Sequence, residues 1–118
     1  MIDEIKKRYE LFSDSLISKI SYERTTEKDG KIEIIIRSMN ALNNYQFELV
    51  KLIITNVIEF RLIEKHPFSS LIINSALLIK ENDFIIIDFY PDIYKDCLKI
   101  NLESDFIIKA EKICYKVL

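Results

Sequence analysis

The chain has 118 residues, of which 49% are hydrophobic and 31% charged, and its net charge is −2 at pH 7. This length and balance predict one globular domain over residues 1–118 and exclude a disordered chain. The lack of a basic excess argues against nucleic acid as a partner. The mixed-charge N-terminus and the short apolar runs argue against a secretory signal or a membrane span, so we expect a cytoplasmic protein that does not bind membranes.

The spacing of apolar residues changes along the chain. Over residues 2–12 it is helical and predicts a short N-terminal helix. From residue 16 the period is two, which predicts strands, and Asp29-Gly30 predicts a hairpin turn. The strands are expected at residues 16–24, 31–40, 45–54, 57–65, 69–83, 83–90, 97–102 and 105–118, the segment 97–102 being a short strand or a connector. In the first of them Leu16 and Ile20 are expected on one face and Ile17 on the other. In the second, Ile32, Ile34 and Ile36 are expected on the core face.

The stretch 48–65 fits two interpretations. Val50, Ile54 and Ile58 have the spacing of a helix face, whereas the many β-branched residues favour strands. We predict two strands that are broken near Thr55-Asn56.

Two isoleucine runs, residues 34–36 and 85–87, are apolar on both faces of their strands. Such strands are covered on both sides, either by a second sheet or by the helix and loops. The sequence therefore predicts a mainly β (α+β) fold. It is an antiparallel sheet or a two-layer β sandwich of about six to eight strands with a short N-terminal helix.

Residues with catalytic or metal-binding chemistry are few. His66 is the only histidine, beside Pro67 in an expected turn, and no established catalytic or phosphate-binding motif is present. Cys97 and Cys114 are expected as reduced, half-buried thiols, with a disulfide between them as the alternative. We expect no catalytic residue, no cofactor and no metal site, and hence no enzyme.

The segment IIIDFYPDIYKD, residues 85–96, carries the clearest candidate site. Three aspartates are spaced by four among aromatic residues, and Pro91 ends the preceding strand. The pair Pro91-Asp92 is reminiscent of a nuclease motif, but the acid-x-lysine that this motif needs downstream is missing. A solvated loop and a protein-binding lip remain, and metal binding is a lesser alternative. If the segment is a lip, tyrosines are its anchors and the aspartates favour a basic partner. The candidate partner-binding residues are Asp88, Tyr90, Asp92, Tyr94 and Asp96.

Four segments, LFSDSLISKI, VIEFRLIE, IIIDFYPD and DFIIKAEKICYKVL, occur in an order that resembles small bacterial β-rich proteins. The first resembles their opening pattern F-(H/S)-D-S-x-I-x-x-I. Ser13 departs from it because that position is often histidine, and a function that depends on this histidine would be missing here. The resemblance implies an immunity protein, which binds and blocks a cognate toxin.

The sequence as a whole favours a non-enzymatic protein-binding module, with an immunity or inhibitor protein that neutralises a bacterial toxin as the specific hypothesis. One alternative is a small enzyme or ligand-binding β domain with an acidic pocket near Asp88 and Asp92. A second alternative is a structural subunit that forms homo-oligomers through a sheet edge.

Overall fold

The computed structural model describes residues 1–27, 29–64 and 72–118. These residues form one helix, α1 (Ile2–Tyr9), a short 3-10 turn, η1 (Ala41–Asn43), and nine strands. The strands are β1 (Ser15–Glu23), β2 (Lys31–Asn40), β3 (Gln46–Leu62), β4 (Ile72–Ile73), β5 (Leu77–Glu81), β6 (Phe84–Asp88), β7 (Asp92–Tyr94), β8 (Cys97–Lys99) and β9 (Phe106–Val117). The prediction of a mainly β, antiparallel fold with a short N-terminal helix is confirmed.

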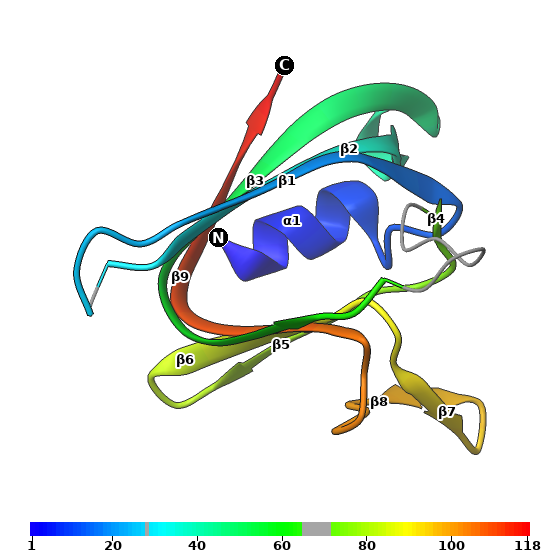
Figure 1. The fold of residues 1–118 in the computed structure, drawn as a ribbon. Helices are drawn as coiled ribbons and strands as arrows, with labels where there is room; N and C mark the ends of the chain where they lie inside the picture. The colour runs from blue at the N-terminus through cyan, green and yellow to red at the C-terminus, as the bar shows by residue number, and fades with distance from the viewer. Residues whose placement is uncertain (28, 65–71) are drawn as a thin grey trace.

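Seven strands form one antiparallel sheet in the order β4-β1-β2-β3-β9-β6-β5, while β7 and β8 form a separate hairpin. The sheet curls so far that β1 and β2 lie on one side of α1 and β5 and β6 on the other, while β3 bends from the first side to the second (Figure 1). One curled sheet with a helix in its concave side therefore replaces a sandwich of two sheets. No helix in the described part of the chain is long and apolar enough to cross a bilayer.

The curl follows from a bulge in β3. The register between β3 and β9 shifts between Val57 and Glu59, and Asn56 has a φ of 55°. A bulge bends and twists the strand that carries it. The break predicted near Thr55-Asn56 is therefore wrong as a chain break, since β3 continues through it, although the irregularity lies at the predicted place.

A second bulge corrects the predicted faces of β1. The register between β1 and β2 shifts between Ile17 and Lys19. After this shift Ile20 packs against the core like Ile17, whereas the Leu16 side chain is 44% exposed. The prediction that Leu16 and Ile20 share a face is wrong because the extra residue reverses the alternation.

Two predicted elements are shorter than expected. The helix ends at Tyr9, and Glu10 and Phe12 follow with positive φ angles of 53° and 54°. In the predicted strand 69–83, β4 and β5 are separated because the Ala76 N–H donates to the Leu11 carbonyl instead of a sheet neighbour. The first residues of that predicted strand, together with His66 and its predicted turn, lie outside the described residues.

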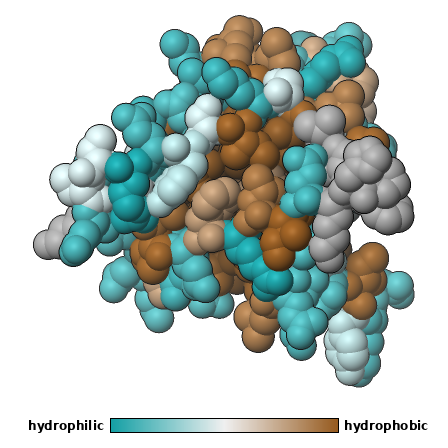
Figure 2. Space-filling view, in the orientation of Figure 1, coloured by the Kyte–Doolittle hydropathy of each residue, from teal (hydrophilic) through white to brown (hydrophobic). Residues whose placement is uncertain are grey.

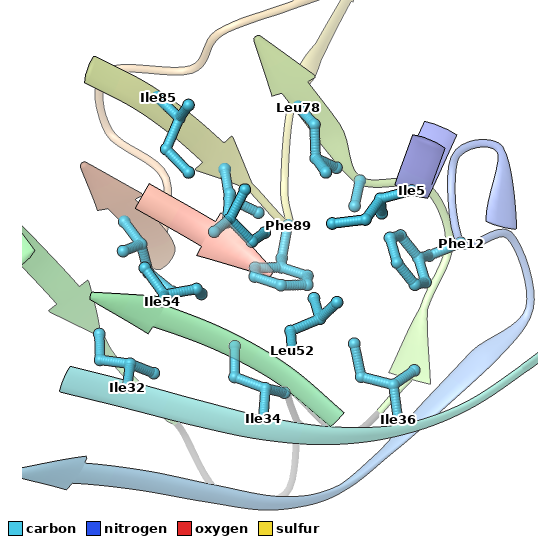
Figure 3. Packing of buried hydrophobic residues seen from close by; sticks show 14 of the residues in the cluster. Ile5, Phe12, Ile32, Ile34, Ile36, Leu52, Ile54, Leu78, Ile85 and Phe89 are labelled. Atoms are coloured by element: carbon cyan, nitrogen blue, oxygen red, sulfur yellow. The ribbon is translucent and has the colours of Figure 1, made fainter. Parts of the chain in front are cut away.

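The core lies between α1 and the concave face of the sheet (Figure 3). As predicted, Ile32, Ile34 and Ile36 of β2 face it, and each is 0% exposed. From the other side it receives Ile5 of α1 and Phe12, both also 0% exposed. The largest fully buried side chains are Phe12, Phe106, Ile5, Ile32, Ile34, Ile36, Leu52, Ile54, Ile73, Leu78, Ile87 and Ile108.

Candidate protein-binding surface

Asp88, at the end of β6, is 0% exposed. Its two carboxylate oxygens accept hydrogen bonds from the backbone N–H of Tyr90 at 3.0 Å and of Asn101 at 2.8 Å. The Asn101 side chain in turn donates to the Tyr90 carbonyl at 3.1 Å. Asp88 therefore ties together the two chain segments that lead into and out of the β7–β8 hairpin. The prediction that Asp88 lies on the binding surface is corrected, since a side chain without exposed area cannot touch a partner.

Tyr90 also lies deeper than predicted. Its side chain is half-buried and packs against the hydrophobic core. Burial, followed by the negative charges of Asp105 and Glu64, raises the pKa of the Tyr90 hydroxyl. Tyr90 thus supports the base of the hairpin, and its ring offers a partner only part of its area.

The hairpin of residues 92–99 projects from the main sheet as a two-stranded unit (Figure 1). Asp92, Tyr94 and Asp96, three of the predicted partner-binding residues, lie exposed on it, and the Tyr94 side chain is 61% exposed. Ile93, which the sequence analysis did not single out, is 75% exposed. Because consecutive strand residues point to opposite faces, each face of the projecting hairpin offers one exposed apolar side chain of the kind that proteins bury in interfaces.

Two lysines share the hairpin with the aspartates. The Lys95 and Lys99 ammonium groups lie 5.4 and 5.8 Å from the centre of the Tyr94 ring. These cation–π contacts restrict the movement of the Tyr94 ring. Because the two lysines balance Asp92 and Asp96, the charge of the hairpin does not by itself select a basic partner.

The hairpin leads directly into an apolar groove on the convex side of the sheet. The groove has a volume of about 230 Å³ and is lined by Glu59, Arg61, Ile86, Ile100, Leu102, Ile107 and Lys109. Leu102, at its rim, is 87% exposed. Apolar residues come from β6, β9 and the segment after β8, while the charged residues come from β3 and β9. We call the exposed side chains of the hairpin together with this groove the hairpin surface.

Figure 2 shows how apolar residues are distributed over one face of the molecule. They gather in the middle of the face and again at the lower right, where the hairpin projects beside hydrophilic residues. A further exposed group on the convex side includes Leu16, Leu49 and Phe47. There the Arg37 guanidinium lies 4.5 Å from the centre of the Phe47 ring and covers part of it. The hairpin surface is the better candidate because its apolar residues project instead of lying flat under a charged side chain.

A polar cluster around Glu48 links α1 to β2 and β3. The Glu48 carboxylate accepts hydrogen bonds from the Tyr9 hydroxyl at 2.6 Å, from Asn40 Nδ2 at 3.2 Å and from Arg8 Nε at 3.4 Å. Burial alone would raise the pKa of Glu48, but the hydrogen bonds from Tyr9, Asn40 and Arg8 outweigh it and lower that pKa. Burial, together with the Glu48 carboxylate, raises the pKa of Tyr9. With its oxygens occupied in this way, Glu48 acts as the anchor of the helix.

The remaining residues of chemical interest lie apart. Cys97 and Cys114 are free thiols, and both are exposed, not half-buried as predicted. Among the described residues, no group of three or more His, Cys, Asp or Glu side chains is arranged to hold a metal ion. Asp88 is enclosed while Asp92 is exposed, so the acidic pocket considered for these two aspartates is not formed.

The sequence contained a signal for part of this surface. Pro91 and the aspartates around it pointed to an exposed segment, but Lys95-Asp96 is not a typical two-residue turn, so the hairpin was missed. No protein-family model matches the chain, and no curated protein or solved structure matches it significantly. The hairpin surface is therefore defined by its geometry alone.

Proposed function

We propose that this protein binds another protein through the hairpin surface. The observation that supports the proposal is the exposure of Ile93, Tyr94 and Leu102, at 75%, 61% and 87%, on and beside a projecting hairpin. Large apolar side chains exposed to this extent are costly in water and favour burial against a partner. The Asp88 bridge at the base of the hairpin supports this role because it holds these side chains in place before binding.

The specific hypothesis is a cytoplasmic immunity protein that blocks a cognate toxin, as the resemblance of its four segments to small bacterial β-rich proteins implies. Blocking by surface contact needs no catalytic group on the immunity protein. Tyr94 and Ile93 would enter an apolar recess of the toxin, and the alternating charges of the hairpin would pair with groups around it.

The experiment uses the product of the neighbouring gene as the candidate partner. Binding kinetics are measured for the unmodified chain, for Tyr94→Ala and Ile93→Ala, and for Leu42→Ala as a matched control. Leu42 is 68% exposed but lies in η1, away from the hairpin. We expect Tyr94→Ala to weaken binding about thirtyfold, mainly through faster dissociation, because truncating an interface tyrosine costs about 2 kcal/mol.

The charged residues give a second readout. Asp92→Asn and Asp96→Asn should change the association rate at low ionic strength and have little effect at high salt. If all hairpin variants bind like Leu42→Ala, the hairpin surface is not the interface. A concentration-dependent dimer that the Tyr94→Ala variant abolishes would instead favour the homo-oligomer alternative.

A further inference from the structure

Among the described residues, the C-terminal half of β9 has a strand neighbour on one side only. β6 pairs with β9 at Ile107–Ala110, whereas β3 pairs with it as far as Val117. Figure 1 shows the end of β9 leaving β6 and running alongside β3. Within the described chain, residues 111–117 therefore form an unpaired sheet edge, which we call the open edge.

The hydrogen-bond pattern shows which backbone groups face outward at the open edge. The Leu118 N–H donates to the Leu49 carbonyl at 2.9 Å, which makes this a hydrogen-bonded position of the β3–β9 ladder. In an antiparallel ladder such positions alternate, so Lys116 and Lys112 also bond to β3. The N–H and C=O groups of Ile113, Tyr115 and Val117 consequently point away from β3, toward the open side.

A groove of about 340 Å³ lies beside the first part of this edge, at residues 111–114. Its apolar lining includes Ile2, Ile85 and Ile113, which are 8%, 5% and 7% exposed. Its charged lining consists of Lys80, Lys112 and Glu111. The Glu111 carboxylate accepts a hydrogen bond from Asn56 Nδ2 at 3.1 Å, so it is already engaged. Backbone donors and acceptors beside an apolar floor are what an added β-strand requires.

The two ends of the sheet, formed by β1 with the short β4 and by β5, lack this combination. β1 is paired with β4 only at Ser15 and Leu16, and the rest of that edge carries the bulge and the exposed Lys19. β5 is five residues long and ends in Lys80 and Glu81. Short edge strands, bulges and edge charges are the usual protection against unwanted strand pairing. The open edge of β9 is longer than β5, lies outside the register shift of its strand and has a buried apolar floor beside it.

We propose that the open edge binds an extended, acidic segment of a partner protein as an additional β-strand. Side chains directly opposite each other on antiparallel strands share a face. The residue of the segment opposite Ile113 would face Ile2, and the residue opposite Tyr115 would lie beside the Tyr115 ring, so both should be apolar. Residues opposite Lys112 and Lys116 would lie on the convex face and should be acidic. The expected motif is acid, apolar, any residue, apolar, acid.

Charge favours such a segment over a second copy of this chain. Pairing two open edges would bring Lys112 and Lys116 of both copies to the same face, and in the register centred on Cys114 each Lys112 would lie directly opposite the other copy's Lys116, where like charges destabilise a sheet. An acidic segment meets the same lysines with opposite charge. This surface is separate from the hairpin surface, and the inference does not depend on the function proposed for it.

The probe is a fluorescent seven-residue peptide with the core glutamate-valine-threonine-valine-glutamate, measured by fluorescence anisotropy. Control peptides carry lysine in place of both glutamates, or N-methyl groups on the two valines. The unmodified chain should bind the acidic peptide, bind the lysine peptide about tenfold more weakly, and not bind the N-methylated one, because cross-strand ion pairs and backbone hydrogen bonds are lost. Equal binding of all three peptides, or no binding of the acidic one, would overturn the proposal.

Charge reversal of the protein provides the matched test. Lys112→Glu with Lys116→Glu should reverse the preference toward the lysine peptide, whereas Lys7→Glu with Lys19→Glu changes the net charge equally and should keep it acidic. In NMR spectra the peptide should slow amide exchange at Ile113 and Tyr115, which should exchange faster than Lys112 and Cys114 in the free protein. Slow exchange at Ile113 and Tyr115 without peptide, together with a concentration-dependent dimer in sedimentation, would instead assign the edge to self-association and refute the proposal.

Discussion

Replacing Asp88 by alanine tests whether the base of the hairpin is held as the structure indicates. The change removes the acceptor of two backbone N–H groups, those of Tyr90 and Asn101. Leaving a buried N–H group without an acceptor costs about 1–3 kcal/mol. Because the adjoining loops can open and admit water, we expect a total of about 2–4 kcal/mol, below the sum of two full penalties.

The effect is measured by urea unfolding followed by circular dichroism. For a domain of this length 1 kcal/mol corresponds to about 4 °C in the melting temperature, so thermal unfolding should show a fall of about 8–16 °C. Asp92→Ala and Asp96→Ala are the matched controls, because both carboxylates are exposed on the hairpin, and they should stay within about 0.5 kcal/mol of the unmodified chain. An Asp88→Ala variant as stable as these controls would refute the role assigned to Asp88.

Three further outcomes test local features. Lys95 and Asp96 have φ angles of 50° and 63° in the hairpin turn, which asparagine and glycine adopt more readily. The double variant Lys95→Asn, Asp96→Gly should therefore raise the free energy of opening of β7 and β8 by about 1 kcal/mol, measured as slower amide exchange. Unchanged exchange would contradict this. A Cβ atom on Gly30 would lie 2.5 Å from an Arg24 guanidinium nitrogen, so Gly30→Ala should lower the free energy of unfolding by about 1 kcal/mol. In an Arg24→Ala background the same change should cost less. Additive effects of the two substitutions would argue against this clash. Hydrogen bonds from Thr25 and Thr26 lower the pKa of Asp29 from 3.8 to about 2, so the unfolded chain binds the proton more tightly. The ionised Asp29 carboxylate therefore stabilises the folded state fully above about pH 4, and this stabilisation is lost as the pH falls through about 2. An NMR titration midpoint of the Asp29 carboxyl group near 3.8 would refute this.

The sequence predicts the strands well where alternation is uninterrupted. Ile32, Ile34 and Ile36 alternate without a break, and all three are buried as expected. It fails where a single extra residue enters a strand, as between Ile17 and Lys19, because a bulge reverses the faces without a marker in the sequence. Which side chains are buried after a bulge depends on the position of the bulge. The local pattern of apolar residues does not show that position.

The candidate site shows the same limit in a different way. A charged residue at the end of a strand is usually exposed, and this is why Asp88 was predicted at the surface. Its burial depends on Asn101, thirteen residues further along the chain, which returns to cover it. Ile93 and Leu102 were missed because single apolar residues in a loop carry no periodic signal. Only the folded chain shows that Ile93 is exposed on a projecting hairpin and that Leu102 lines a groove.

The two proposed surfaces follow from the bend in β3 and β9. The β3–β9 register shifts between Val57 and Glu59, and before the bend β9 pairs with both β3 and β6, whereas after it only β3 remains. The bend that lets the sheet enclose α1 therefore also leaves the end of β9 open. On the other half of β9, the chain that returns from the hairpin crosses the convex face and makes the groove beside Leu102. Because Lys112, Lys116, Ile93 and Tyr94 are all exposed, variants at either surface should leave the core intact, and each binding test reports on its own surface.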